Sequence, residues 1–232
     1  MSKKPNIIAI IPARGGSKGI PHKNIKLLNG KPLIYYTINE AKKSKYLCRL
    51  IVSTEESEIA EIAKGFKAEV IERPIELAQD DTPSLPVFQQ VVKYLEEVGN
   101  FHPDIIVVLQ PTTPLRTIED IDGAIELFLN TDCNSVVSVC CVEHPPHWMY
   151  TLEEGRLKPL IKDEREITRR QDASITYRLN GAVYVIHRNI LMEQNRVMDN
   201  NTRPFIMPLE RSIDIDTDLD FKLAGLLMKE RE

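Results

Sequence analysis

The sequence predicts an α/β fold, in which helices cover both faces of a doubly wound, mostly parallel sheet. Two apolar runs, residues 7–11 and 105–109, are continuous rather than alternating, which is typical of strands buried on both faces. Segments with the period of an amphipathic helix alternate with the strand-like runs along most of the chain. In folds of this class, ligands bind at the carboxyl ends of the strands.

The expected elements follow one another in a regular order. Strands are expected at residues 7–11, 50–53, 105–109, 135–142 and 181–186. Helices are expected at residues 32–44, 56–64, 85–98, 117–128 and 219–229. Pro32 suits the first position of a helix, and Thr117 with Asp120 predicts a capping box at the start of another.

Residues 143–177 differ from the rest of the chain in composition and in hydrophobic pattern. Pro145 and Pro146 are adjacent, the single tryptophan follows, and a charged stretch at residues 162–170 lacks a helical period. The sequence therefore predicts a core formed by residues 1–142 and 178–232, with an inserted arm between them. An arm of about 35 residues is too short to fold as an independent domain.

Composition excludes several classes of function. The chain has 232 residues, and 30 basic against 34 acidic side chains give a net charge of −4, which disfavours broad nucleic-acid binding. No window approaches the ~20 apolar residues of a membrane span, and the run at residues 7–11 is too short for a signal peptide. The cysteines, Cys48, Cys133, Cys140 and Cys141, show no CxxC spacing. We expect a cytoplasmic protein with neither nucleic-acid nor membrane partners.

The segment after the first strand, residues 12–24, carries the strongest functional signal. Three glycines allow this loop to curl and to present backbone N–H groups, while Arg14, Lys18 and Lys23 supply positive charge. It matches neither the Walker pattern nor GxGxxG. A flexible basic surface loop is the alternative, but the position directly after a buried strand favours a cradle for a polyphosphate.

Two aspartates near the carboxyl terminus form a second signal. Strand-like alternation places Asp214 and Asp216 on the same face, where their mutual repulsion is relieved if both bind a divalent cation. Carboxylates together with phosphate oxygens are ligands that suit Mg²⁺. The alternative is that Asp216 or Thr217 caps the last helix and Asp214 is merely solvated. The predicted phosphate-binding loop at residues 12–24 favours the metal site over the helix cap.

Two further segments are less specific. Gln110 follows the second buried strand, where prolines stiffen the turn that would aim it into a site, and Arg116 is expected to support that turn. Arginines at residues 168–172 and Asn180 could bind a carboxylate, but charge runs are usually solvated, so spacing alone assigns them no role.

Together these segments resemble the acylneuraminate cytidylyltransferase family, the CMP-sialic acid synthetases and their bacterial relatives. The matching motifs are IPARGGSKGIPHKN, LQPTTPLR, RRQD with YRLNGAVYV, and SIDIDTDLDF, in one order over nearly the whole chain. The arm sequence HPPHWMYTLEEGRLKPL resembles the CMP-legionaminic acid synthetase subgroup. The resemblance implies a Rossmann-like core, a dimerisation arm, and Mg²⁺-dependent transfer of CMP from CTP to a nine-carbon 2-keto sugar acid. It implies a homodimer, with a tetramer as the alternative.

The resemblance also implies roles for individual residues. The nucleotide-binding set is Ala13, Arg14, Gly15, Ser17, Lys18, Lys23, Asn24, Arg73 and Thr82. The sugar-binding set, partly contributed across the dimer interface, is Gln110, Arg170, Tyr177, Arg178 and Asn180. Asp214 and Asp216 match the metal ligands, and Arg14, Lys23 and Asp216 are the expected catalytic residues. Where many relatives read RQDLP, residues 170–174 read RQDAS, which leaves the arm geometry and the choice of sugar open.

Three rival functions follow from the same motifs. The first is a cytidylyltransferase for the eight-carbon acid Kdo, and the second is a relative that uses GTP. A non-catalytic nucleotide-binding module is the third, and the paired carboxylates disfavour it because a mere binder does not need them.

Overall fold

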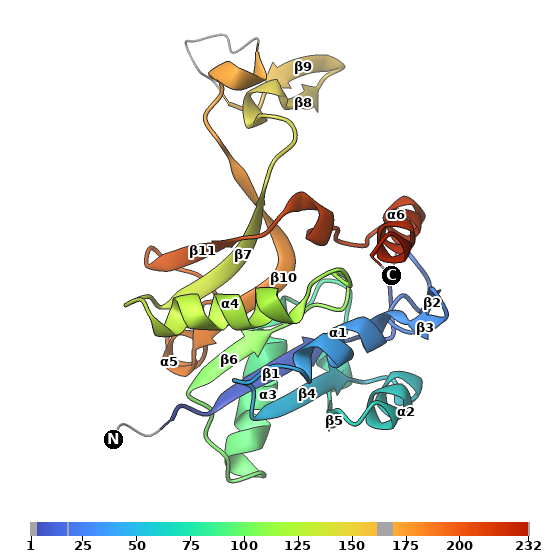
Figure 1. Cartoon of the computed structure of the whole chain (residues 1–232), viewed down its shortest axis with the longest axis vertical. Helices are drawn as coiled ribbons and strands as arrows, with labels where there is room; N and C mark the ends of the chain where they lie inside the picture. Colours follow the sequence, from blue (N-terminus) through green and yellow to red (C-terminus); the bar gives the residue numbers. More distant parts are fainter. Residues whose placement is uncertain (1–3, 18, 162–168, 232) are drawn as a thin grey trace.

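A seven-stranded sheet with the order β11-β7-β10-β6-β1-β4-β5 forms the centre of the protein (Figure 1). The computed structural model describes residues 4–17, 19–161 and 169–231. The strands of this sheet are β1 (Ile7–Pro12), β4 (Arg49–Thr54), β5 (Glu69–Glu72), β6 (Ile105–Val108), β7 (Ser135–Cys141), β10 (Tyr177–His187) and β11 (Thr202–Ile206). All neighbouring pairs are parallel except those of β10, which runs antiparallel to both β6 and β7.

Helices cover both faces of this sheet, as the sequence predicts. The helices are α1 (Leu33–Ala41), α2 (Ser57–Gly65), α3 (Ser84–Glu97), α4 (Ile118–Leu129), α5 (Arg188–Met192) and α6 (Asp218–Lys229). Ile7, Ala9 and Ile11 of β1 pack in one core with apolar residues of α1, α2 and α4. Ile8 and Ile10 point to the opposite face and pack with residues of α3 and α5. The continuous apolar run of β1 is therefore explained by burial on both faces.

The structure differs from the expected elements at the two edges of the sheet. β5 and β11 were not expected, because β5 has only Val70 and Ile71 between two glutamates and β11 contains Pro204. Both are edge strands, where proline and a short strand are tolerated. The capping box is present at the start of α4, where Thr117 and Asp120 bond reciprocally. A two-stranded ribbon, β2 (Leu27–Leu28) with β3 (Lys31–Pro32), precedes α1.

A hairpin projects from the sheet between β7 and β10 (Figure 1). It consists of β8 (Tyr150–Glu153) and β9 (Arg156–Pro159), joined by a tight turn at Glu154 and Gly155, which both have positive φ. Leu152 and Leu157 face each other across it and are 73% and 71% exposed. Within the described ranges, no helix has both the length and the apolar character needed to cross a membrane.

Candidate active site

A pocket of about 430 Å³ lies at the carboxyl ends of β1, β5 and β6. This edge of the sheet is the one at which the fold class predicts a ligand. Four segments line the pocket: the glycine loop after β1, the segment between β5 and α3, the turn after β6, and the approach to α6. The predicted residues that line it are Arg14, Ser17, Lys23, Asn24, Arg73, Thr82, Gln110 and Asp216. Lys18 lies outside the described residues.

The glycine loop is held in shape by side chains of its own chain. Asn24, which is buried, donates from Nδ2 to the carbonyl of Arg14 at 2.9 Å. The backbone N–H of Gly15 donates to Glu55 Oε1 at 2.6 Å, and that of Ala13 donates to the carbonyl of Ser53 at 2.9 Å. Ala13 and Gly15 are thus anchoring points for the loop and do not themselves line the pocket.

The loop and the aspartate segment are in direct contact. A Cβ at Gly19 would lie 2.2 Å from the carbonyl oxygen of Asp216, so only glycine permits this approach. Lys23 Nζ donates to the carbonyl of Ile215 at 2.6 Å and to Asp216 Oδ1 at 3.1 Å. Two motifs almost 200 residues apart in sequence therefore share one wall of the pocket.

The two aspartates differ in their surroundings. Burial raises the pKa of Asp214, and the nearby charge of Asp216 adds to this, while a hydrogen bond with Thr112 and the charge of Lys23 oppose it. Among the described residues, the buried Oδ1 of Asp214 has no hydrogen-bond partner. Asp216 is 75% exposed at its side chain, and Thr217, not Asp216, caps α6.

The aspartate pair fits a cation that is completed by a ligand rather than one held by protein alone. No group of three or more His, Cys, Asp or Glu side chains suited to a metal occurs in the part of the chain that the structure describes. An unpartnered carboxylate oxygen beside a second carboxylate is suited to Mg²⁺, which commonly takes one or two carboxylates together with phosphate oxygens and water.

A bulge in β10 brings Gln110 and Asp214 together. The pairing of β10 with β7 shifts between Leu179 and Tyr184, and Gly181 adopts a φ of +69° there. A Cβ at Gly181 would lie 2.7 Å from Gln110 Oε1 and 3.4 Å from Asp214 Oδ2. The absence of a side chain therefore lets these two polar groups approach the same point, and bulges often occur beside active sites.

Asn180 fills the gap that this bulge leaves in the sheet. It is fully buried, accepts from Ser138 Oγ at 2.6 Å and donates to Ser212 Oγ at 2.9 Å. The backbone N–H of Val183 donates to the same Ser138 hydroxyl at 2.7 Å. Side chains thus replace the missing ladder bonds, so the structure gives Asn180 a supporting position beneath the pocket.

The other predicted sugar-binding residues also lie outside the pocket of this single chain. Arg170 and Tyr177 are exposed on the arm and at the start of β10. Arg178 donates to the carbonyl of Ser212 at 3.3 Å and lines a separate apolar groove beside α6. Of the predicted sugar-binding set, Gln110 alone lines the 430 Å³ pocket.

Arg116 supports the turn that carries Gln110, the role expected from the sequence. It is buried and donates to the carbonyls of Gln110 at 3.2 Å and Ala182 at 2.7 Å, and to Thr37 Oγ1 at 2.7 Å. Burial lowers its pKa to about 10. One guanidinium therefore joins the end of β6, the bulge of β10 and α1.

A cavity of about 390 Å³ adjoins the main pocket, and sequence reasoning missed it. Ser84 and Gln110 belong to both walls, and the remainder is formed by Phe88, Tyr184, Arg196, Val197 and Met198. These residues come from α3, β10 and the segment after α5, which no motif connects. The cavity offers mostly apolar surface next to Gln110.

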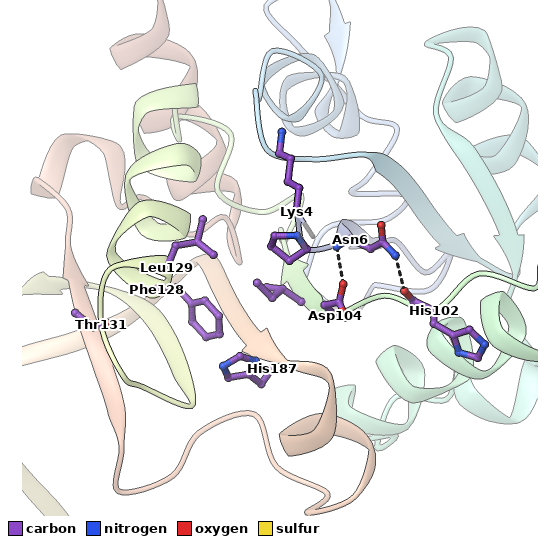
Figure 2. A pocket seen from close by; sticks show the side chains of 10 residues that line it. Lys4, Asn6, His102, Asp104, Phe128, Leu129, Thr131 and His187 are labelled. Atoms are coloured by element: carbon purple, nitrogen blue, oxygen red, sulfur yellow. Dashed lines mark hydrogen bonds between the residues drawn. The ribbon is translucent and has the colours of Figure 1, made fainter. Parts of the chain in front are cut away.

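A cavity of about 500 Å³ at the opposite edge of the sheet is built differently (Figure 2). Asn6 and Asp104 directly precede β1 and β6, so this is the amino edge of the parallel strands. The backbone N–H of Asn6 donates to Asp104 Oδ2 at 2.7 Å, and Asn6 Nδ2 donates to the carbonyl of His102 at 3.0 Å (Figure 2). Neither the glycine loop nor Asp214 or Asp216 lines this cavity.

The fold and the carboxyl-edge pocket define an α/β protein with a glycine-rich, basic loop placed against an acidic pair. The chain belongs to the cytidylyltransferase family, whose model matches residues 8–210.

Comparison with known proteins identifies related sequences. The chain is 35% identical over 227 residues to a CMP-N,N'-diacetyllegionaminic acid synthase of Legionella pneumophila, with 96% of each chain covered. It is 30% identical over 230 residues to an N-acylneuraminate cytidylyltransferase of Escherichia coli, and the match covers 98% of this chain and 53% of that protein.

A solved structure shares the fold. The structure of a CMP:2-keto-3-deoxy-manno-octonic acid synthetase complexed with CTP superposes with a TM-score of 0.73, covering 98% of this chain and all of the other. The sequences are 17% identical, so this likeness describes the fold alone.

Proposed function

We propose that this protein transfers the CMP group of CTP to the anomeric hydroxyl of a nine-carbon 2-keto sugar acid and releases pyrophosphate. The contact of Lys23 Nζ with the Ile215 carbonyl and Asp216 carries the proposal, because it places the basic loop against the segment that bears both Asp214 and Asp216. The family match supports CTP as the nucleotide. The name of the Legionella relative, similar over nearly its full length, supports legionaminic acid or a related sugar.

The residues that bind the nucleotide would act by positioning it and by neutralising its charge. Arg14 and Lys23 line the pocket and would meet the triphosphate, together with Lys18 of the same loop. Phosphoryl-type transfer needs little covalent chemistry from the protein, so orientation and electrostatic stabilisation supply most of the rate. Arg73 and Thr82, on the wall that follows β5, would bind the nucleoside part.

Mg²⁺ is the proposed cofactor, with Asp214 and Asp216 as its protein ligands. When bound, it would neutralise negative charge on the phosphates. The unpartnered Oδ1 of Asp214 and the repulsion between the two carboxylates support this assignment. Asp216, which already contacts Lys23, would link the cation to the basic loop.

The sugar side is proposed to be completed by a second copy of the chain. Gln110 stands between the main pocket and the adjoining apolar cavity, where it would bind the acceptor. Arg170, Tyr177, Arg178 and Asn180 complete the sugar set proposed from the family, Asn180 by supporting the bulge of β10 in which it is buried. Exposed Leu152, Leu157 and Leu160 on the arm support a homodimer, with a tetramer as the alternative. Light scattering at several concentrations tests this, and a monomer throughout would contradict it.

We also propose that the protein works in the cytoplasm. The four cysteines, Cys48, Cys133, Cys140 and Cys141, are free thiols, which supports a reducing compartment. Neither nucleic acid nor membrane is a proposed partner, because the net charge is −4 and the basic residues gather in local sites.

Pyrophosphate release on crossing nucleotides with sugars tests the function. CTP and GTP are each mixed with Mg²⁺ and with one of four acids: legionaminic acid, sialic acid, pseudaminic acid or Kdo. We expect release with CTP and a nine-carbon acid. Preference for Kdo or for GTP would move the protein to one of the rival substrate classes. If the protein binds a nucleotide but releases no pyrophosphate with any pair of nucleotide and sugar acid, it is a non-catalytic module.

A further inference from the structure

One acidic side chain, Glu55, contacts the glycine loop and Arg73 without lining the pocket itself. Glu55 directly follows β4, which is the neighbour of both β1 and β5 in the sheet. The glycine loop follows β1, and Arg73 follows β5. Because all three strands are parallel, Glu55 lies between the loop and Arg73 at the carboxyl edge.

Glu55 contacts both neighbours. Its Oε1 accepts the backbone N–H of Gly15 at 2.6 Å, and its Oε2 lies 3.9 Å from Arg73 Nη1. The side chains of Glu55 and Arg73 are 11% and 4% exposed, so water screens this contact poorly. Arg73 is held from below by Ser53, which accepts from Nε at 3.2 Å and, through its carbonyl, from Nη2 at 2.8 Å.

A carboxylate in this position is unfavourable for an anionic ligand unless it organises the groups around it. Arg14 and Arg73 line the same pocket, and their like charges repel each other. The negative charge of Glu55 opposes that repulsion. Oε2 has no hydrogen-bond partner among the described residues, so its contribution to Arg73 is electrostatic.

We propose that Glu55 is a positioning residue for the nucleotide: it clamps the glycine loop through Gly15 and fixes Arg73, so that loop and guanidinium face the ligand together. This role rests on the proposed function, because it assumes that the 430 Å³ pocket binds a nucleoside triphosphate. Glu55 does not line that pocket, and it acts through Gly15 and Arg73.

The test measures CTP binding by titration calorimetry, without sugar, for the wild type and Glu55→Gln. Glutamine keeps the size of the side chain but removes its charge. We expect CTP affinity to fall about tenfold, the difference between a charge-assisted and a neutral hydrogen bond. In turnover assays, KM for CTP should rise by a similar factor, while kcat and KM for the sugar stay within about twofold.

Glu61→Gln is the matched control, because it removes the same charge from an exposed position on α2. Equal CTP affinity for Glu55→Gln and Glu61→Gln would overturn the proposal. If Glu55→Gln does not fold, Glu55→Asp decides, since its shorter carboxylate cannot reach both partners. Weaker CTP binding then supports the role and wild-type binding overturns it. A wild type that binds CTP but releases no pyrophosphate with any sugar acid contradicts the proposed function and leaves this binding test intact.

Discussion

Two cavities of similar volume, about 430 and 500 Å³, lie at opposite edges of the sheet and differ in the chemistry of their walls. At the carboxyl edge, basic and acidic side chains from four separate loops surround one space. At the amino edge, Asn6 bonds to Asp104, and the ring of His187 packs on Phe128 with centroids 4.6 Å apart. Burial lowers the pKa of His187, which disfavours a positive charge there. Convergence of charged groups, not volume, distinguishes the candidate site.

The largest expected effect is at Asp216. Replacing it with Asn removes one carboxylate of the proposed Mg²⁺ pair and its ion pair with Lys23. We expect kcat to fall at least ~100-fold, the usual scale for loss of a group that stabilises transition-state charge. Pyrophosphate release measures this, and an unchanged melting temperature shows that the fold is intact. Near-normal turnover with Mg²⁺ would show that Asp216 is not a ligand of the proposed cation.

The next effect concerns stability at the same edge. Arg116→Met fills much of the same volume but removes the charged donor from the carbonyls of Ala182 and Gln110, and only the latter keeps a hydroxyl donor, from Thr113 at 3.2 Å. Buried acceptors that lose a charged donor cost about 3 kcal/mol. Urea unfolding should show that loss in the free energy of unfolding. A loss below about 1 kcal/mol would mean that the turn after β6 does not depend on Arg116.

A smaller effect is expected at the bulge of β10. Gly181→Ala places a side chain at a φ of +69°, which costs about 1 kcal/mol, and its Cβ displaces Gln110. We expect KM for the sugar to rise severalfold while CTP affinity is unchanged. Gly155→Ala is the control, because that glycine also has positive φ but has open space around it. A CTP effect equal to the sugar effect would contradict the assignment of Gln110.

The smallest effect belongs to the amino edge and provides a baseline for the comparison. Arg188 donates to both carboxylate oxygens of Glu96, at 2.6 and 3.0 Å, and this hydrogen bonding lowers the pKa of Glu96. A lowered folded-state pKa stabilises the protein above the unfolded pKa, and this stabilisation disappears as the pH falls through the folded value, below 4.5.

Glu96→Gln should therefore cost no more than about 1 kcal/mol at pH 7 and nothing once the pH has fallen below the folded-state pKa of Glu96. Thermal unfolding across that pH range measures the difference, and turnover should match the wild type. A loss of activity in this variant would show that the amino edge contributes to function, and the contrast between the two edges would fail.

Local pattern predicted much of the fold and part of the site. The buried strands at residues 7–11 and 105–109, the loop at residues 12–24 and the supporting role of Arg116 all follow from patterns within a few residues. β5 and β11 were not predicted because edge strands need little apolar surface. The role of Glu55 was not predicted because its position depends on the adjacency of β1, β4 and β5, which no local pattern encodes.

The residues assigned to the sugar teach a complementary lesson. Asn180 belongs to a recognisable motif, yet its side chain repairs the hydrogen bonding of a bulge. Arg170 and Tyr177 lie on or beside the arm. Whether they reach a sugar therefore depends on which surface of another copy the arm contacts. A single chain's sequence carries no signal for contacts that another copy would provide, and these assignments stay predictions.

The antiparallel direction of β10 has a consequence for how such a protein can diversify. β7 and β10 are neighbours, so the arm is simply a long connection between two hydrogen-bonded strands. Connections of this kind tolerate insertion and deletion, because the strand pairing on either side is fixed by the core. The arm can therefore be lengthened, shortened or exchanged without disturbing the strand pairing of the core or the carboxyl-edge pocket.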